Sequence, residues 1–301
     1  MAEQPALLFW TVGRHGGQNE NDSHGSLRLW RLKPPRGDDR MAQTWLISGP
    51  PGCGKTTWML NALKTHKGTR GYLRLAGCPA EGLEHGFDSG IDLAYLQDQI
   101  PDLRDLSKSA QTFCDDAEDL LALIELPQFH SPEESGTNGL DPRVKPQLEE
   151  LALQPDRVLH FGHDEGLPRQ DTLEFSQLEA WSCQLQGRIW DPNSLSSFWF
   201  ELVNGAYGDV YRAKGLMNLP DGRAFFCNWM VSQNGSQFLP LEQVAPPDGR
   251  PNRISALVVQ GKALDSNGIR STIADCLLTD AVLEMHQAPL RERQSQPTPA
   301  N

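Results

Sequence analysis

The chain has 301 residues, 38% of them hydrophobic, which suits about two domains with ordinary cores. Its net charge of -12 at pH 7 argues against nucleic acid and against anionic membranes as partners, because both would repel it. We expect no membrane span either, since no apolar run approaches the roughly 18 residues that a transmembrane helix needs.

The cysteines favour a cytoplasmic protein. All 6 are scattered along the chain and none forms a CxxC pair, which indicates reduced thiols rather than disulfides or a structural zinc. The apolar segment Ala6–Val12 is too short for an export signal and lacks a basic flank. The polar stretch over residues 1–40 is expected to be a disordered extension, and we hypothesise that Met41 is the true start.

The segment Gly49–Thr57, GPPGCGKTT, fits the phosphate-binding P-loop at every position. An apolar strand is expected before it, at Thr44–Ser48, and a helix after it, over Thr57–Thr65. Strand, glycine loop and helix are the context that this motif requires. The sequence therefore predicts a bound nucleoside triphosphate.

The residues of this loop have distinct expected roles. The glycines let successive backbone N–H groups face the phosphates, and the helix N-terminus adds a partial positive charge. Lys55 would contact the β and γ phosphates, Thr56 would offer its hydroxyl to Mg²⁺, and Thr57 would start the helix. We expect Cys53 to be a small filler of the loop rather than an activated thiol. The predicted nucleotide-binding residues here are Gly49, Gly52, Cys53, Gly54, Lys55, Thr56 and Thr57.

Two apolar segments, Gly71–Leu75 and Asp119–Glu125, predict further strands of a parallel sheet. Glu125 would end its strand at the edge where nucleotides bind in open α/β sheets, so it is our candidate catalytic residue, contacting Mg²⁺ or the attacking water. An exposed carboxylate without such a role is an equal alternative on this segment alone. A helix over Lys145–Leu153 and a strand over Asp156–Phe161 complete an α/β domain.

The chain changes character near Gln170 and continues with an α+β pattern. Asp191-Pro192 predicts a capped helix, Asp221-Gly222 a hairpin turn, and Asp265 the cap of a second helix. These elements predict a compact sheet with helices on one side, its strands lying over 209–219, 223–232, 237–244 and 257–261.

The sequence resembles the CobW-like P-loop GTPases, relatives of the hydrogenase and urease nickel-insertion GTPases. GPPGCGKTT is similar to the family's GxxGxGKTT loop. Three segments are similar to the CobW C-terminal domain, namely VYRAKG at 210–215, ALVVQGKALD at 256–265 and ADCLLTD at 274–280.

The resemblance covers most of residues 41–281 and implies a fold of two domains. It implies an α/β P-loop NTPase domain with a mostly parallel sheet over residues 41–169. A smaller α+β CobW C-terminal domain would follow over 170–290, and a disordered tail over 291–301.

The middle of the chain departs from the family. Gln128 stands where the switch glycine is expected. Phe161, Gly162 and His163 replace the first three positions of the guanine-reading Asn-Lys-x-Asp, and Asp164 alone remains to accept hydrogen bonds from guanine.

The family's Cys-x-Cys-Cys metal motif is absent, with Cys78 and Cys114 isolated. The histidines and acids near 84–88 and 160–164 follow no recognised ligand spacing, so we expect no dedicated transition-metal site.

Two functions of different classes follow. The first is a slow Mg²⁺-dependent GTPase that is metallochaperone-like and contacts a client protein through its C-terminal domain. The second is a non-hydrolysing binding module that holds GTP or ATP as a regulatory ligand, and an ATPase is a third. We favour the GTPase, because a P-loop lysine and threonine with a strand-end glutamate suffice in principle to position Mg²⁺ and phosphates.

Overall fold

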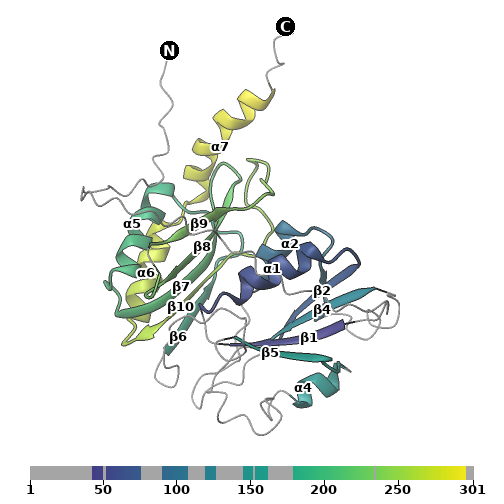
Figure 1. The fold of residues 1–301 in the computed structure, drawn as a ribbon. Helices are drawn as coiled ribbons and strands as arrows, with labels where there is room; N and C mark the ends of the chain where they lie inside the picture. The colour runs from purple at the N-terminus through teal and green to yellow at the C-terminus, as the bar shows by residue number, and fades with distance from the viewer. Residues whose placement is uncertain are drawn as a thin grey trace, which may run out of the picture. The chain divides into compact units, whose positions relative to one another are not determined.

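A computed structural model describes residues 43–49, 52–75, 90–107, 119–126, 145–151, 153–161, 179–233 and 235–295. All of them belong to one compact unit, residues 38–301. The expected extension over residues 1–40 lies outside the described residues. Figure 1 shows a parallel sheet and an antiparallel sheet, each with its own helices. We call residues 43–161 the P-loop region and residues 179–295 the C-terminal region.

The P-loop region contains a five-stranded parallel sheet in the order β3-β2-β4-β1-β5. Its strands are β1 (Gln43–Ser48), β2 (Thr69–Arg74), β3 (Arg104–Asp105), β4 (Leu120–Glu125) and β5 (Arg157–His160). Its helices are α1 (Lys55–Thr65), α2 (Ile91–Gln99) and α4 (Lys145–Glu150). The sequence predicted all of these elements except α2 and β3.

Side chains alternate between the two faces of this sheet, as the strand period requires. Ile47 and Leu123 pack with residues of α1 and α2, whereas Leu46 and Ile124 pack on the opposite face with Leu148 of α4. By the same alternation, Arg74 at the end of β2 and Glu125 at the end of β4 lie on the face that carries α1 and α2.

Helix α1 begins at Lys55 and not at Thr57, so the predicted start of this helix was wrong. Gly54 is the N-cap, with φ of 89°, and no side chain caps the helix. The glycine loop therefore runs straight into the helix, and Lys55 and Thr56 belong to its first turn.

The C-terminal region contains a five-stranded antiparallel sheet in the order β6-β10-β7-β8-β9. Its strands are β6 (Glu179–Gln184), β7 (Asp209–Asn218), β8 (Ala224–Met230), β9 (Gln237–Pro240) and β10 (Ala256–Lys262). Its helices are α5 (Pro192–Val203), α6 (Ser266–Cys276) and α7 (Asp280–Ser295). Asp191 and Asp265 accept hydrogen bonds from the backbone N–H of Ser194 and Gly268, which confirms both predicted caps.

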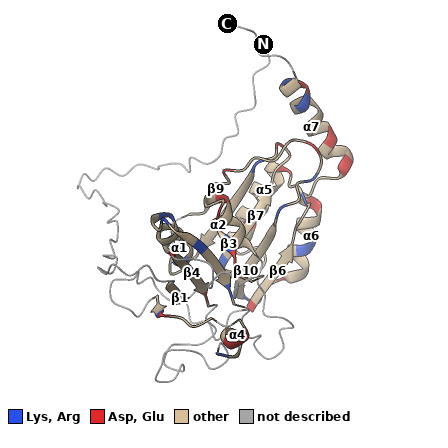
Figure 2. Cartoon of the chain, turned by 90° about the vertical axis from the view of Figure 1, so that its right-hand side faces the viewer, with Lys and Arg blue, Asp and Glu red and all other residues tan. Residues whose placement is uncertain are grey.

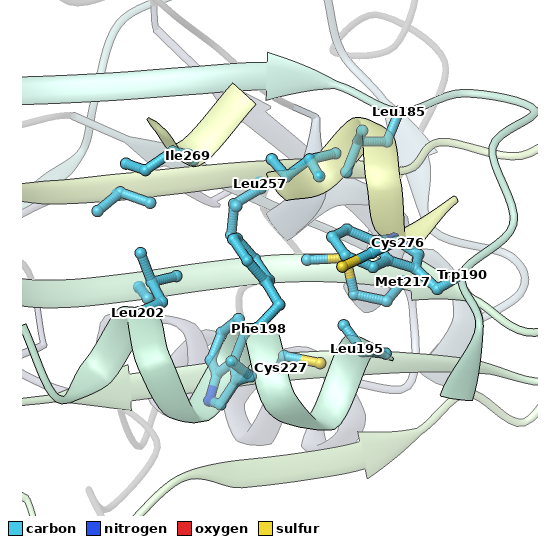
Figure 3. Close-up of a cluster of buried hydrophobic side chains, with 14 of the residues drawn as sticks. Leu185, Trp190, Leu195, Phe198, Leu202, Met217, Cys227, Leu257, Ile269 and Cys276 are labelled. Carbon is cyan, nitrogen blue, oxygen red and sulfur yellow. The ribbon is translucent and has the colours of Figure 1, made fainter. Parts of the chain in front are cut away.

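One face of the antiparallel sheet is covered by α5 and α6. Trp190, Phe198 and Leu202 are buried there against Met217 and Leu257 of the strands, as Figure 3 shows. This cluster is the core of the C-terminal region, and it includes residues of the capped helix that the sequence predicted at Asp191-Pro192.

The opposite face of the same sheet is covered by α2, a helix of the P-loop region that the sequence did not predict. Ile91 and Tyr95 of α2 pack against Leu216, Phe226 and other residues of that face. Tyr95 stacks on Phe226 with ring centroids 4.2 Å apart. The antiparallel sheet therefore lies against the P-loop region through α2.

Helix α7 extends to Ser295, so the residues from 291 to 295 are helical and not part of a tail as predicted. Acidic and basic residues lie next to one another along it (Figure 2), and Arg291 pairs with Glu284. In the described part of the chain, no helix combines the length and apolar character that crossing a membrane requires.

Candidate functional site

The P-loop lies at the carboxyl end of β1, where parallel sheets bind nucleotides. Its described glycines have positive backbone angles that other residues rarely adopt, with φ of 147° at Gly49, 79° at Gly52 and 89° at Gly54. Pro50 and Pro51 lie outside the described residues. A Cβ added at Gly52 would lie 1.6 Å from Met230 Sδ, so a side chain here would have to displace Met230, and the positive φ disfavours one in any case.

Lys55 is buried beneath the loop, with 8% of its surface exposed. Its Nζ donates to the Gly49 carbonyl at 2.6 Å and lies 4.0 Å from Glu125 Oε1. Burial lowers the pKa of the Lys55 ammonium, while Cys53 and Glu125 oppose the shift. The lysine is thus held inside the loop that it would use to contact phosphate.

Thr56 Oγ1 donates to a carboxylate that the sequence did not identify, Asp92 Oδ1, at 2.9 Å. Asp92 lies in the first turn of α2 and is 4% exposed. Burial alone would raise its pKa, but Lys214 and Arg74 outweigh that effect and hold the pKa of Asp92 well below its usual range. A hydroxyl and an ionised carboxylate therefore lie side by side at the start of α1.

Glu125 is buried at the end of β4, with 4% exposed, which excludes the alternative of an exposed strand-end carboxylate. Tyr72 donates to its Oε2 at 2.6 Å, and Arg74 lies 3.8 Å away. Burial and the charge of Glu125 raise the pKa of Tyr72 well above its ordinary value, so the phenol remains a donor. Glu125 lies within the same charge cluster as Lys55.

Two further cations come from β7 in the C-terminal region. Lys214 Nζ contacts Asp92 Oδ1 and lies 3.4 Å from Thr56 Oγ1. Burial lowers the pKa of Lys214 to about 8 against the opposing effect of Asp92, so the ammonium keeps its proton at neutral pH. Arg212 is partly buried nearby, and within the described residues nothing accepts a hydrogen bond from its Nε.

These six side chains carry an excess of positive charge. Among the described residues, Lys55, Arg74, Arg212 and Lys214 outnumber the two carboxylates close to them, Asp92 and Glu125. Basic side chains held together in a largely dehydrated cluster favour the approach of an anion. The arrangement is therefore suited to an anionic ligand with several oxygens, such as a polyphosphate.

Other predicted residues contribute differently. Cys53 is buried among apolar residues of the loop, as expected for a filler, whereas Thr57 is exposed on the first turn of α1. Ser48 Oγ and His160 Nδ1 share a hydrogen bond of 2.5 Å. In the described ranges, no three His, Cys, Asp or Glu side chains gather as a metal site.

Phe161 is 1% exposed and packs edge-on against Trp58, with ring centroids 5.7 Å apart. A Cβ at Gly49 would lie 2.6 Å from Phe161 Cβ, so Phe161 packs directly against the start of the loop. Its side chain is not available to read a base. Gln128, Asp164 and the other candidates near 84–88 and 162–164 lie outside the described residues.

Comparison with protein families identifies the C-terminal region. Residues 179–277 match the family model described as the cobalamin synthesis protein cobW C-terminal domain. This part of the chain is therefore similar to the CobW C-terminal domain. The match begins at the first residue of β6 and ends just after α6, and it confirms the resemblance indicated by the three motifs.

Among solved structures, the chain is similar to the Zn(II)-bound YjiA GTPase from E. coli, with 12% identity, a TM-score of 0.30, and coverage of 78% of this chain and 99% of that one. A Zn(II)-bound triple mutant of YjiA GTPase matches with 12% identity, a TM-score of 0.31 and the same coverage of 78% and 99%. None of the curated proteins compared with the chain matches it significantly.

Sequence reasoning missed Asp92, Arg74, Arg212 and Lys214. Asp92 follows Gly90-Ile91, and the glycine directly before an apolar residue was the available signal for a helix start. Arg212 and Lys214 lie in the VYRAKG motif of the CobW C-terminal domain, two residues apart on one face of β7. The sequence shows this spacing, but it does not show that this face of β7 is buried against the P-loop region.

Proposed function

We propose that this protein is a Mg²⁺-dependent P-loop GTPase of the CobW-like type, whose nucleotide state governs contact with a client protein in metal or cofactor supply. The client would bind through the CobW C-terminal domain. We place the protein in the cytoplasm, because the described cysteines Cys53, Cys183, Cys227 and Cys276 are all free thiols.

The observation that carries the proposal is the convergence of Lys55, Thr56, Asp92 and Glu125 at one end of the parallel sheet. Lys55 and Thr56 come from the P-loop, Asp92 from α2 and Glu125 from β4. These are the residue types that nucleotide triphosphatases use for phosphate, cation and water. The cationic excess around them supports a polyphosphate ligand.

The donor set also fits Mg²⁺, a hard cation that prefers oxygen ligands. The Thr56 hydroxyl and the Asp92 carboxylate are adjacent, and both are oxygen donors at the mouth of the loop. We propose that they hold the cation together, while Glu125, which lies 4.0 Å from Lys55, orients a water or the cation. Bound Mg²⁺ would neutralise charge on the terminal phosphates.

A second candidate is the non-hydrolysing binding module, or an ATPase, and the burial of Phe161 favours it. This side chain occupies the position of the guanine-reading asparagine in the family, yet it packs inside the protein. Base recognition would then rest on fewer contacts than in the CobW-like GTPases. A site of this kind would hold nucleotide with little preference for the base.

Titration of the purified protein with fluorescent GTP and ATP analogues in Mg²⁺, followed by phosphate release on the same preparation, separates these functions. We expect saturable binding that favours GTP, and slow phosphate release. Lys55→Ala should abolish binding, because it removes the buried cation of the loop. The variant is expected to fold, because Arg74 still lies near Glu125 and offsets its charge. Circular dichroism checks this.

Each result has a distinct meaning. Equal affinity of the folded Lys55→Ala variant and the wild type would contradict the P-loop assignment. Binding without measurable phosphate release would support the non-hydrolysing module instead of the GTPase, and tighter binding of ATP than of GTP would support the ATPase.

A further inference from the structure

The C-terminal region contributes a buried ammonium to the P-loop site. Lys214 lies on the face of β7 that also carries Leu216, and Leu216 packs against Ile91 and Tyr95 of α2. Its Nζ lies 5.2 Å from the centre of the Phe226 ring. The same contacts that attach the antiparallel sheet to α2 therefore fix the lysine beside the start of α1.

The ammonium lies where two oxygen donors meet. It contacts Asp92 Oδ1 and is 3.4 Å from Thr56 Oγ1, and these two oxygens are themselves 2.9 Å apart. They are the pair that the proposed function assigns to Mg²⁺. A divalent cation bound by both oxygens would have to share the space that the ammonium now occupies.

We propose that Lys214 occupies the divalent-cation position of the nucleotide site, so that Mg²⁺ and the Lys214 ammonium compete for Asp92 and Thr56. The inference rests on the proposed function. Without a divalent cation, Lys214 neutralises Asp92 and permits triphosphate to approach. When Mg²⁺ enters with the nucleotide, Lys214 leaves Asp92, and the link between β7 and α2 loses its buried ion pair.

Competition has a simple electrostatic basis. Asp92 is buried and also pairs with Arg74 at 2.9 Å, so its carboxylate already faces two cations. Adding a divalent cation while keeping both would place like charges at hydrogen-bond distance, which is strongly unfavourable at low dielectric. Arg74 remains tied to Glu125 as well as to Asp92, whereas Lys214 is anchored from the other sheet. Lys214 is therefore the cation that gives way.

Lysine acetylation read by mass spectrometry tests displacement in the unaltered protein. The protein is saturated with a non-hydrolysable GTP analogue and labelled in EDTA or in Mg²⁺. We expect labelling of Lys214 to rise several-fold with Mg²⁺, because the amine leaves its buried ion pair. Lys262 is the internal control, since it lies on the neighbouring strand β10 and over an aromatic ring, 5.9 Å from the centre of Tyr211.

Affinity for the fluorescent GTP analogue, measured in EDTA and in saturating Mg²⁺, tests competition with the variant Lys214→Met. In EDTA the variant should bind more weakly than wild type, because Asp92 then faces the phosphates without the Lys214 cation. In Mg²⁺ it should bind at least as tightly as wild type. The ratio of the two affinities should rise by about tenfold or more over wild type, and Lys262→Met should leave it unchanged.

The outcomes separate the two proposals. Absence of any triphosphate binding by the wild type overturns both. If the wild type binds triphosphate, an unchanged affinity ratio in Lys214→Met, or unchanged labelling of Lys214 in the wild type, overturns only this inference. Equal weakening of GTP-analogue binding by Lys214→Met in EDTA and in Mg²⁺ would make Lys214 an ordinary phosphate ligand and would overturn the inference as well. If Lys214→Met does not fold, labelling of the wild type decides.

Discussion

The parallel and antiparallel sheets bury their polar side chains for different purposes. In the P-loop region the buried charges Lys55, Asp92 and Glu125 gather at one end of the sheet and contact one another or their close neighbours. In the C-terminal region, buried Ser255 donates to a strand carbonyl and buried Gln287 to loop carbonyls, so both fasten the fold to itself.

Lys214 is buried in the C-terminal region but follows the pattern of the P-loop region. Its partner is Asp92 of α2, a long way off in sequence, and not a backbone group of its own sheet. In this protein, the buried polar groups of the candidate site have charged partners on other elements. The buried polar groups that hydrogen-bond to backbone carbonyls instead stabilise the fold.

The largest predicted effect is on the stability of the C-terminal region, whose core consists of packed apolar side chains. Phe198→Ala should lower the free energy of unfolding by about 3–5 kcal/mol, because it empties part of a core in which this ring is 1% exposed. Urea unfolding followed by tryptophan fluorescence measures the loss, since Trp190 and Trp199 lie in the same core.

The control for this core variant is Phe200→Ala, a change on the same helix at a side chain that is 55% exposed. We expect a change within about 0.5 kcal/mol. Similar losses for the two variants would show that the antiparallel sheet is not stabilised by the cluster of Figure 3.

The next effect concerns turnover in the P-loop region. Glu125→Gln should slow phosphate release by roughly 100- to 1,000-fold and weaken nucleotide binding much less, because orienting water or Mg²⁺ matters mainly in the transition state. Single-turnover phosphate release and analogue titration measure the two quantities separately.

Tyr72→Phe is the matched control for Glu125, because it removes only the hydrogen bond to the carboxylate and should slow release less. A Glu125→Gln variant with wild-type turnover would remove Glu125 from the catalytic residues. If turnover is unmeasurable even in wild type, the binding-module function gains support.

Removal of the second carboxylate should alter the requirement for Mg²⁺. Asp92→Asn should raise the Mg²⁺ concentration for half-maximal GTP binding by roughly 100-fold, equivalent to about 3 kcal/mol for a lost charged contact. Asp98→Asn is the control on the same helix, since Asp98 is also buried but accepts hydrogen bonds from the backbone of Glu242 and Gln243. Equal shifts in both variants would assign Asp92 to the attachment of α2, not to the cation.

The sequence indicated most of the fold because apolar periodicity is local. The continuous apolar run of β4, the alternating strands of the hairpin and the Asp191 and Asp265 caps each follow from a few neighbouring residues. Helix α2 was missed because two of its buried residues are Asp92 and Asp98, which interrupt the apolar pattern.

The candidate site was predicted only where one motif contains it. The P-loop specified Lys55 and Thr56, but the charged residues around them come from three other elements: Asp92 contacts Thr56, and Arg74 and Lys214 contact Asp92. Polar residues alternating along a strand ordinarily indicate a solvent-facing side. On β7 that side faces α2, and no pattern within the strand reports what will cover it.

The smallest predicted effect concerns the preference of the P-loop region for guanine over adenine. Because Phe161 is buried, guanine preference would depend on Asp164, whose carboxylate can accept from two guanine N–H donors. Such a charged contact is worth about 1.5–3 kcal/mol, roughly ten- to a hundredfold in favour of GTP over ATP. Asp164→Ala should erase that ratio without weakening ATP binding, as paired titrations with the two analogues would measure. A strong GTP preference that survives the substitution would mean that another segment reads the base, and a wild type that prefers ATP would remove the GTPase assignment.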